Sequence, residues 1–269
     1  MSAVRVAALQ MVSAPELAPN LETAARLVAA AAAAGARLVA LPENFYLIGR
    51  AEGDKLRLRE PDGGAGPIQG FLAECARRHR VWIVGGTAPI ACADASRMRS
   101  ACLVFDDSGR RVARYDKMHL FRFKSEAESY DESRTLEPGE RPVALESPFG
   151  RMALSICYDV RFPELYRGLG DFDLMFVPSA FTAPTGAAHW ETLLRARAIE
   201  NQAYVVAPAQ GGLHASGRRT WGHSMIVDPW GAVIASRDEG EGVVLAEVDP
   251  ARVREVRAEL PALANRRAL

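Results

Sequence analysis

The sequence predicts an α/β fold with mixed sheets, built as one domain. Continuous apolar runs typical of buried strands alternate with helical segments, which is the pattern of sheets covered by helices. Several strands are joined by connections short enough for hairpins, so we expect antiparallel as well as parallel neighbours. No linker divides the 269 residues, and no short repeat is present.

The first half of the chain begins with a strand and a helix. The helix is expected to have Asn20 as its N-cap and to end at Gly35. A hairpin is expected around Asp106-Asp107-Ser108-Gly109, which is a strong turn signal. The elements expected here are strands over 4–10, 38–41, 81–86, 100–105 and 111–115, and helices over 20–34 and 68–80. The charge-rich segment 118–142 is expected to be a loop.

The second half continues the alternation and closes with a polar tail. Strands are expected over 151–157, 174–178, 204–209, 224–228, 233–236 and 242–248, and helices over 163–168 and 189–202. From Asp249 the chain is polar and basic, with a short helical stretch near Val253.

Charge and N-terminal sequence narrow the class of protein. The 33 basic and 33 acidic residues balance, which argues against nucleic acid or an anionic membrane as the main partner. The N-terminus enters a strand-like run without the pattern of a signal peptide, and the apolar stretch 29–34 is too short to span a bilayer. We therefore expect a cytoplasmic protein with reduced thiols.

The cysteines and histidines do not predict a metal site. There is no CxxC, HxxxH or HExxH spacing among the four cysteines and five histidines. Cys75, Cys92 and Cys102 are interpreted as ordinary packing residues. No metal and no organic cofactor is expected.

Cys157 is the most informative residue of the chain. It follows the apolar run 152–156 and precedes a segment that becomes helical near Pro163. Such a thiol lies at the end of a buried strand, where helix N-termini and neighbouring cations favour its thiolate. Glu43 and Lys117 each follow another predicted strand. A carboxylate, an ammonium and a thiol at three strand ends are the parts of an acyl-transfer site.

Together these three groups can hydrolyse an amide. The thiolate attacks the carbonyl carbon, and a glutamate moves the protons if burial raises its pKa toward neutrality. An ammonium and a backbone N–H beyond the cysteine stabilise the oxyanion. The acyl-enzyme is a thioester, which water activated by the same glutamate then hydrolyses.

Each residue also has an ordinary structural interpretation. Cys157 can pack as a small apolar side chain, Glu43 can be a surface carboxylate in a loop, and Lys117 can be a solvated charge. A Cys/His pair is the rival catalytic arrangement, but no histidine stands in a papain-like context. The histidines available for it are His119, His189, His214 and His223.

Three ordered motifs resemble the nitrilase superfamily of carbon–nitrogen hydrolases. They are Leu-Pro-Glu-Asn at 41–44, Tyr-Asp-Lys-Met-His-Leu at 115–120 and Ser-Ile-Cys-Tyr-Asp-Val-Arg-Phe-Pro-Glu at 155–164. The resemblance covers about residues 4–265. It implies a four-layer α-β-β-α sandwich that forms homodimers or higher homo-oligomers. We expect a hydrolase domain over 1–250 and a tail over 251–269 that packs at an oligomer interface.

The resemblance also implies roles for the motif residues. Glu43 is expected to be the general base and acid, Lys117 the oxyanion stabiliser and Cys157 the nucleophile. The backbone N–H of Tyr158 is expected to complete the oxyanion hole.

A second glutamate lies close to these residues in the family. The segment Tyr-Asp-Glu-Ser at 130–133 matches its motif, so Glu132 is the candidate. Glu126 and Glu128 lie nearby and keep the register open.

The downstream sequence resembles the Nit branch of the superfamily. The matching segments are 178–181, 185–186, 188–191, 194–200 and 222–231. Within that branch, residues 179–181, 209–210 and 223–225 are more similar to the amidases of deaminated glutathione than to ω-amidases. The segment 213–219 departs from the pattern of the branch.

This resemblance implies a substrate with two carboxylates, in which an amide joins a 2-oxoglutaryl group to cysteinylglycine. Arg161 is best placed by sequence to bind such an anion, unless it belongs to a structural ion pair. Phe181 and Thr185 match pocket positions of the branch. The alternatives are ω-amidase action on 2-oxoglutaramate or another short ω-amide, and a non-catalytic domain that binds a partner protein.

Overall fold

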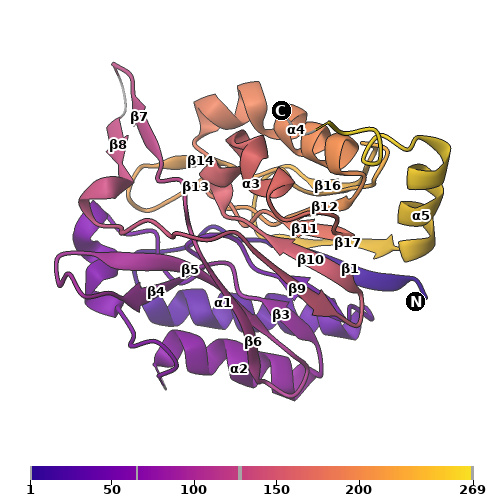
Figure 1. The fold of residues 1–269 in the computed structure, drawn as a ribbon. Helices are drawn as coiled ribbons and strands as arrows, with labels where there is room; N and C mark the ends of the chain where they lie inside the picture. Colours follow the sequence, from indigo (N-terminus) through magenta and orange to yellow (C-terminus); the bar gives the residue numbers. More distant parts are fainter. Residues whose placement is uncertain (1, 65, 127–128, 268–269) are drawn as a thin grey trace.

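The computed structural model describes residues 2–64, 66–126 and 129–267. It confirms the predicted α/β architecture, with two mixed sheets packed face to face between two layers of helices (Figure 1). One outer layer holds α1 (Leu17–Ala33) and α2 (Pro67–His79). The opposite layer holds α3 (Pro163–Arg167) and α4 (Ala183–Asn201).

The first sheet has seven strands in the order β17-β1-β2-β3-β5-β4, with β6 also paired to β5. The strands β1, β2 and β3 run parallel, while β17 pairs antiparallel with β1 and β5 antiparallel with β3. The bounds are β1 Val4–Gln10, β2 Leu38–Ala40, β3 Trp82–Val84, β4 Ala88–Ala91, β5 Met98–Phe105, β6 Arg111–Asp116 and β17 Gly242–Val248.

The second sheet has six strands in the order β16-β15-β12-β11-β10-β9. Its centre, β10-β11-β12, is parallel, and its outer pairs are antiparallel. The bounds are β9 Val143–Ser147, β10 Gly150–Leu154, β11 Leu174–Phe176, β12 Tyr204–Ala207, β15 Ser224–Val227 and β16 Val233–Arg237. Each sheet therefore has three parallel strands whose carboxyl ends can carry a site.

Strand β1 shows why four layers form. Its alternate residues Val6 and Ala8 belong to the core between the sheets, whereas Ala7 and Leu9 belong to the core beneath α1 and α2. Successive side chains of a strand point to opposite faces, so a run that is apolar throughout needs cover on both sides. The continuous apolar strands thus require helices outside and a second sheet inside.

The start of α1 differs from the prediction. The helix begins at Leu17, and Asn20 lies inside it rather than at its N-cap. The buried Asn20 amide donates to the carbonyls of Ala14 and Tyr46, and its oxygen accepts from the Ala14 N–H. Asn20 therefore holds the loop before α1 and the segment at Tyr46 in place. A buried asparagine near the start of a helix gives the same sequence signal as an N-cap, which is why the prediction differed.

Several short elements were not predicted. The segment 118–142, expected as a loop, contains the hairpin β7 (Arg122–Lys124) and β8 (Ser129–Asp131) and the short 3-10 helix η2 (Glu132–Arg134). A second hairpin pairs β13 (Gly211–Leu213) with β14 (Arg219–Trp221). Strands β4 and β9 and the 3-10 helix η1 (Glu52–Leu58) were also missed, and α4 begins six residues before the predicted 189.

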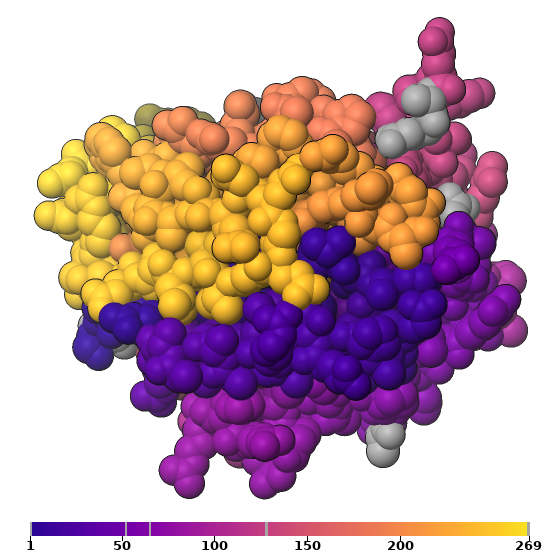
Figure 2. All heavy atoms as spheres, turned by 180° about the vertical axis from the view of Figure 1, so that it is seen from behind, coloured from indigo at the N-terminus to yellow at the C-terminus, as the bar shows by residue number. Residues whose placement is uncertain are grey.

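The C-terminal strand returns to the N-terminus. Figure 2 shows the yellow C-terminal residues against the indigo N-terminal ones, where β17 pairs with β1 along its whole length. The helix α5 (Pro250–Glu259) follows, capped by Asp249, and buries Val253 and Val256. The packing of 251–269 at an oligomer interface stays a prediction, and residues 268–269 lie outside the described residues. No helix in the described ranges could cross a membrane.

Gly86 lies where the two parallel strands β2 and β3 end side by side. Its φ is +57°, and a Cβ there would lie 2.1 Å from the carbonyl oxygen of Pro42, the residue before Glu43. We expect Gly86→Ala to lower the free energy of unfolding by about 2 kcal/mol or more, because left-handed strain and overpacking each cost about 1–3 kcal/mol. Urea denaturation followed by circular dichroism measures this.

Gly70 is the matched control, because it lies exposed in α2 with no atom within 4 Å of an added Cβ. Gly70→Ala should raise stability by about 0.5–1 kcal/mol. Equal stabilities of the two variants would contradict the close approach at Gly86.

Candidate active site

A buried ammonium lies between two carboxylates where the sheets meet. Lys117 follows β6 and is 1% exposed. Its Nζ lies 2.8 Å from Oε1 of Glu43, which follows β2, and 2.9 and 2.7 Å from the two carboxylate oxygens of Glu132. The structure thus brings together three of the four residues expected to be catalytic.

Of the candidates for the second glutamate that the structure describes, Glu132 contacts Lys117. It begins η2, and its Oε2 also accepts a hydrogen bond of 2.7 Å from the Phe121 N–H. Glu126 is exposed in a bend that follows β7, and Glu128 lies outside the described residues.

Cys157 stands on a sharp turn rather than on the strand itself. Strand β10 ends at Leu154, earlier than the predicted 157, and the 3-10 helix η3 (Cys157–Arg161) begins at the cysteine. Cys157 has a φ of +49°, and its N–H donates to the carbonyl of Pro178 at 2.9 Å. A left-handed conformation at a non-glycine residue costs energy that the surrounding structure must supply. The turn fixes where the thiol points.

Asp159 joins this turn to the segment that carries Lys117. Its buried carboxylate accepts from the Ile156 N–H at 2.9 Å and from the Tyr115 hydroxyl at 2.7 Å. It also accepts from the His119 N–H at 3.0 Å, and the His119 ring lies 2.7 Å away. One side chain therefore ties the residues before and after Lys117 to the residue before Cys157.

The surroundings keep Cys157 as a neutral thiol. Burial raises its pKa well above the ordinary value, and the nearby carboxylate of Glu43 adds to this against the opposing effect of Lys117. The expectation that neighbouring cations favour a resting thiolate is therefore wrong for the free enzyme. The main reason is burial, which disfavours the charged thiolate, and the carboxylates of Glu43 and Glu132 oppose the effect of Lys117.

Glu43 shows the opposite balance. Burial alone would raise its pKa, but the charge and hydrogen bond of Lys117 outweigh burial, and the pKa is lowered. Burial likewise works against the charge of Lys117, yet Glu132 and Glu43 raise its pKa well above the ordinary value. The expected rise of the Glu43 pKa toward neutrality is thus not found; Glu43 is a carboxylate ready to accept a proton.

A narrow pocket gives access to the thiol. Arg161, Phe181, Thr185 and Tyr158, all predicted to contact substrate, line it together with Glu43, Asn44, Phe121, Glu132, Cys157, Ala180, Thr182 and Arg218. None of these lining residues is exposed. The site is therefore a closed slot at the carboxyl ends of strands from both sheets.

Arg161 has no acidic partner among the described residues. Its Nη1 lies 3.2 Å from Nδ1 of His189, and its guanidinium lies 5.2 Å from the centre of the Phe181 ring. Its Nε is buried without a hydrogen-bond partner in that part of the chain. A cation left in this state next to a thiol can bind an anionic group of a ligand.

The histidines have other contacts. His119 bonds Asp159, and His214 is buried between Ser13 and Thr220. None of the histidines lines the slot at Cys157. Within the described ranges, no three His, Cys, Asp or Glu side chains are grouped so that they could hold a metal ion.

The sequence is similar to a known family of enzymes over most of its length. The model of the carbon-nitrogen hydrolase family matches residues 5–258. A deaminated glutathione amidase of Synechocystis is 44% identical over 266 residues, which cover 97% of both chains.

The chain belongs to the carbon-nitrogen hydrolase family.

Two solved structures show the same fold. The Nit3 protein of Saccharomyces cerevisiae, a member of branch 10 of the nitrilase superfamily, is 30% identical with a TM-score of 0.87 and covers 99% of this chain and 97% of its own. The NitFhit protein of C. elegans is 38% identical with a TM-score of 0.90. The match covers 99% of the present chain and 66% of the NitFhit chain. The predicted superfamily, Nit-branch likeness and enzyme class, an amidase, are confirmed.

Sequence reasoning missed several residues of this carbon-nitrogen hydrolase site. Asp159 lies two residues after Cys157, within the third motif. An aspartate between apolar residues is a signal of a buried, hydrogen-bonded carboxylate. Asn44, Phe121 and Arg218 reach the slot from three distant segments. No local pattern marked Arg218, because its position depends on the β13–β14 hairpin.

Asp159 supplies a test of how the hydrolase site is held. Asp159→Asn replaces one acceptor oxygen by a donor that faces donors, so we expect a loss of about 1–3 kcal/mol of stability. The turnover number should fall at least tenfold with little change in KM, because the thiol moves relative to Lys117. Steady-state kinetics with denaturation curves measures both.

Tyr115→Phe is the matched control, because it removes one hydrogen bond to Asp159 and keeps the carboxylate. It should cost less on both measures. An Asp159→Asn enzyme with unchanged turnover would show that the bond network does not position the thiol.

Proposed function

We propose that this hydrolase cleaves deaminated glutathione to 2-oxoglutarate and cysteinylglycine through a thioester on Cys157. The observation that carries the proposal is its 44% identity, over 97% of both chains, to a deaminated glutathione amidase. The mechanism is supported by Cys157 and Glu43, which line one slot, and by Lys117, which bonds the Glu43 carboxylate.

In the first half-reaction the Cys157 sulfur attacks the amide carbonyl carbon while its proton passes to the Glu43 carboxylate. The lowered pKa of Glu43 and the raised pKa of Cys157 mean that this transfer must accompany attack rather than precede it. The oxyanion is stabilised by Lys117 and by the backbone N–H of Tyr158. Glu43 then gives the proton to the leaving nitrogen, and the C–N bond breaks.

In the second half-reaction water takes the place of the amine. Glu43 accepts a proton from the water as its oxygen attacks the thioester carbon. The new tetrahedral intermediate collapses, the C–S bond breaks, and the proton returns from Glu43 to the sulfur. Atoms and charges balance, and Lys117 keeps its proton throughout, in line with its raised pKa.

Arg161 is proposed to bind the carboxylate of the 2-oxoglutaryl group. Its side chain lines the slot and has no acidic partner among the described residues. Intact glutathione carries an ammonium where the substrate has a 2-oxo group, and that cation would face the guanidinium. The aromatic rings of Phe181 and Tyr158, 5.2 and 5.6 Å from the guanidinium carbon, hold Arg161 in place.

The nucleophile can be tested by substitution. Cys157→Ser should fold normally and lose nearly all turnover, because an alcohol is far less acidic and harder to activate. Mass spectrometry of the unaltered enzyme mixed with substrate should show an acyl adduct on Cys157 alone. The buried Cys102, whose pKa burial raises to about 12, is the control thiol. An adduct on another cysteine, or full activity of Cys157→Ser, would overturn the assignment.

The substrate can be tested by a side-by-side assay. Deaminated glutathione should give a higher kcat/KM than 2-oxoglutaramate, and intact glutathione should hardly react. Arg161→Met should raise KM for both substrates by about tenfold or more, the effect of one lost charge-assisted hydrogen bond to the carboxylate that they share. Preference for 2-oxoglutaramate would instead favour an ω-amidase. Faster hydrolysis of intact glutathione or of a simple nitrile would contradict the branch assignment.

A further inference from the structure

A second cavity opens beside the catalytic slot. This outer chamber has a volume of about 410 Å³ and shares Phe121, Glu132 and Arg218 with the slot. The other residues that line it are Ile48, Gly49, Arg50, Ala51, Lys55, Ser129, Tyr130, Asp131, Thr135, Leu136, Ser216 and Gly217. Several of them, such as Arg50 and Gly217, are exposed, so the chamber is the open approach to the closed slot.

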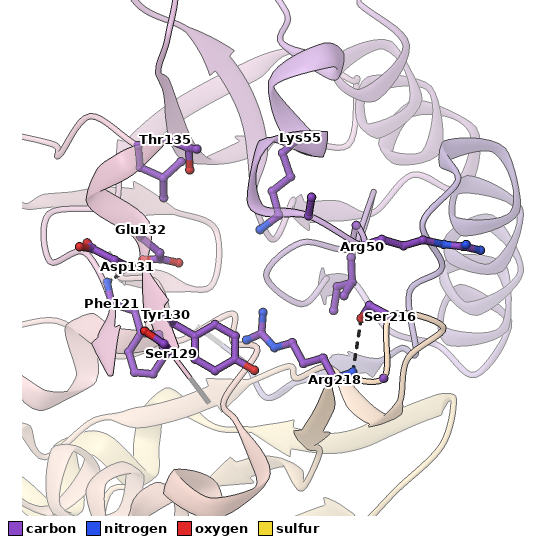
Figure 3. Close-up of a pocket in the computed structure, with 15 residues that line it drawn as sticks. Arg50, Lys55, Phe121, Ser129, Tyr130, Asp131, Glu132, Thr135, Ser216 and Arg218 are labelled. Atoms are coloured by element: carbon purple, nitrogen blue, oxygen red, sulfur yellow. Dashed lines mark hydrogen bonds between the residues drawn. The ribbon is translucent and has the colours of Figure 1, made fainter. Parts of the chain in front are cut away.

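Lys55 points into this chamber from the side opposite Tyr130 and Arg218 (Figure 3). It is half-buried on η1, and its Nζ donates to the side-chain oxygen of Asn44 at 2.8 Å. It forms no ion pair with a carboxylate in the described part of the chain, whereas Arg50 points away from the cavity. An ammonium that has given up part of its hydration and has one neutral partner can accept an anion.

Arg218 stands at the junction of the two cavities. Its Nη2 donates to the carbonyl of Ala180, and its guanidinium lies 5.0 Å from the centre of the Tyr130 ring. Its Nε is buried and has no partner among the described residues. A row of cations therefore runs from Arg161 in the slot through Arg218 to Lys55.

The order of the reaction decides which half of the substrate lies in which cavity. The acyl group must stay bound while the amine leaves and water replaces it. The leaving half therefore belongs in the cavity that opens to solvent, and the acyl half in the closed slot. A chamber of this size is in the range of small-molecule sites.

We propose that the outer chamber is the leaving-group subsite, in which Lys55 binds the terminal carboxylate of a peptide-like amine and Arg218 lines its path. This inference rests on the proposed function and adds a second anion site to it. It predicts selection for amides whose leaving amine carries a carboxylate several bonds from the scissile nitrogen. A short primary amide leaves the chamber unused.

The test compares two substrates that differ only at that end. They are deaminated glutathione and its C-terminal carboxamide, which keeps the acyl group, the thiol and the size. The measured quantity is the ratio of their kcat/KM values. Lys55 also lowers the pKa of Glu43, so Lys55→Met can slow both substrates, but a shared loss cancels in the ratio.

The unaltered enzyme should prefer the free carboxylate by about tenfold, the effect of one charge-assisted hydrogen bond. In Lys55→Met the ratio should fall to near one. Arg57→Met is the matched control, because Arg57 is an exposed cation of the same helix η1 and does not line the chamber. It should keep the preference.

The pH dependence gives a second readout. Burial lowers the pKa of Lys55 to about 8. The charges of Arg218 and Lys117 also lower it, whereas the carboxylates of Glu43 and Glu132 raise it. Lys55 is charged below that value, so the preference should be full near pH 7 and fade as the pH rises through about 8. Groups that act on both substrates alike cancel in the ratio.

The outcomes separate the two proposals. If the unaltered enzyme does not hydrolyse deaminated glutathione, the proposed function and this subsite both fall. If it does, but the carboxamide reacts equally well or Lys55→Met keeps the preference, the subsite alone is overturned. If Lys55→Met and Arg57→Met lose the preference for the free carboxylate to the same extent, the preference reflects surface charge in general, and the subsite is also overturned.

Discussion

The structure depends on one buried ammonium held between two carboxylates. Lys117 is shielded from water and bonds Glu43 and Glu132. Burying such charges is costly unless each is paired and hydrogen-bonded, and losing one partner leaves a charge that costs about 3–5 kcal/mol. The three segments that supply these residues must therefore pack so that all three side chains are in hydrogen-bond contact. The positions of the other site residues depend on this packing.

The nucleophile comes from the other sheet. Cys157 follows β10 of the second sheet, whereas Glu43 and Lys117 follow β2 and β6 of the first. Their relative positions depend on the packing between the sheets, and Asp159 fastens that packing locally through Tyr115, His119 and Ile156. Well-packed interiors deform little, so the thiol and the base keep their places.

The electrostatics of the site suit proton transfer rather than a permanent thiolate. Burial raises the pKa of Cys157, the carboxylates of Glu43 and Glu132 add to this, and Lys117 lowers the pKa of Glu43. The cluster of one ammonium and two carboxylates is net negative, so an anionic substrate needs attraction from other cations to approach the sulfur. Arg161, Arg218 and Lys55, which form no ion pair with a carboxylate in the described ranges, line the two cavities and would supply attraction along the proposed path of the substrate.

The sequence by itself determined the α/β class, most strands and the three motifs that place Glu43, Lys117 and Cys157, because periodicity and turn signals are local. It did not determine the start of α1 or the hairpins β7–β8 and β13–β14, whose short strands are stabilised by tertiary contacts. The sign of each pKa shift, the contact of Glu132 with Lys117 and the position of Lys55 at the outer chamber were decided only in three dimensions. Each depends on distances between segments far apart in the chain, which no local pattern encodes.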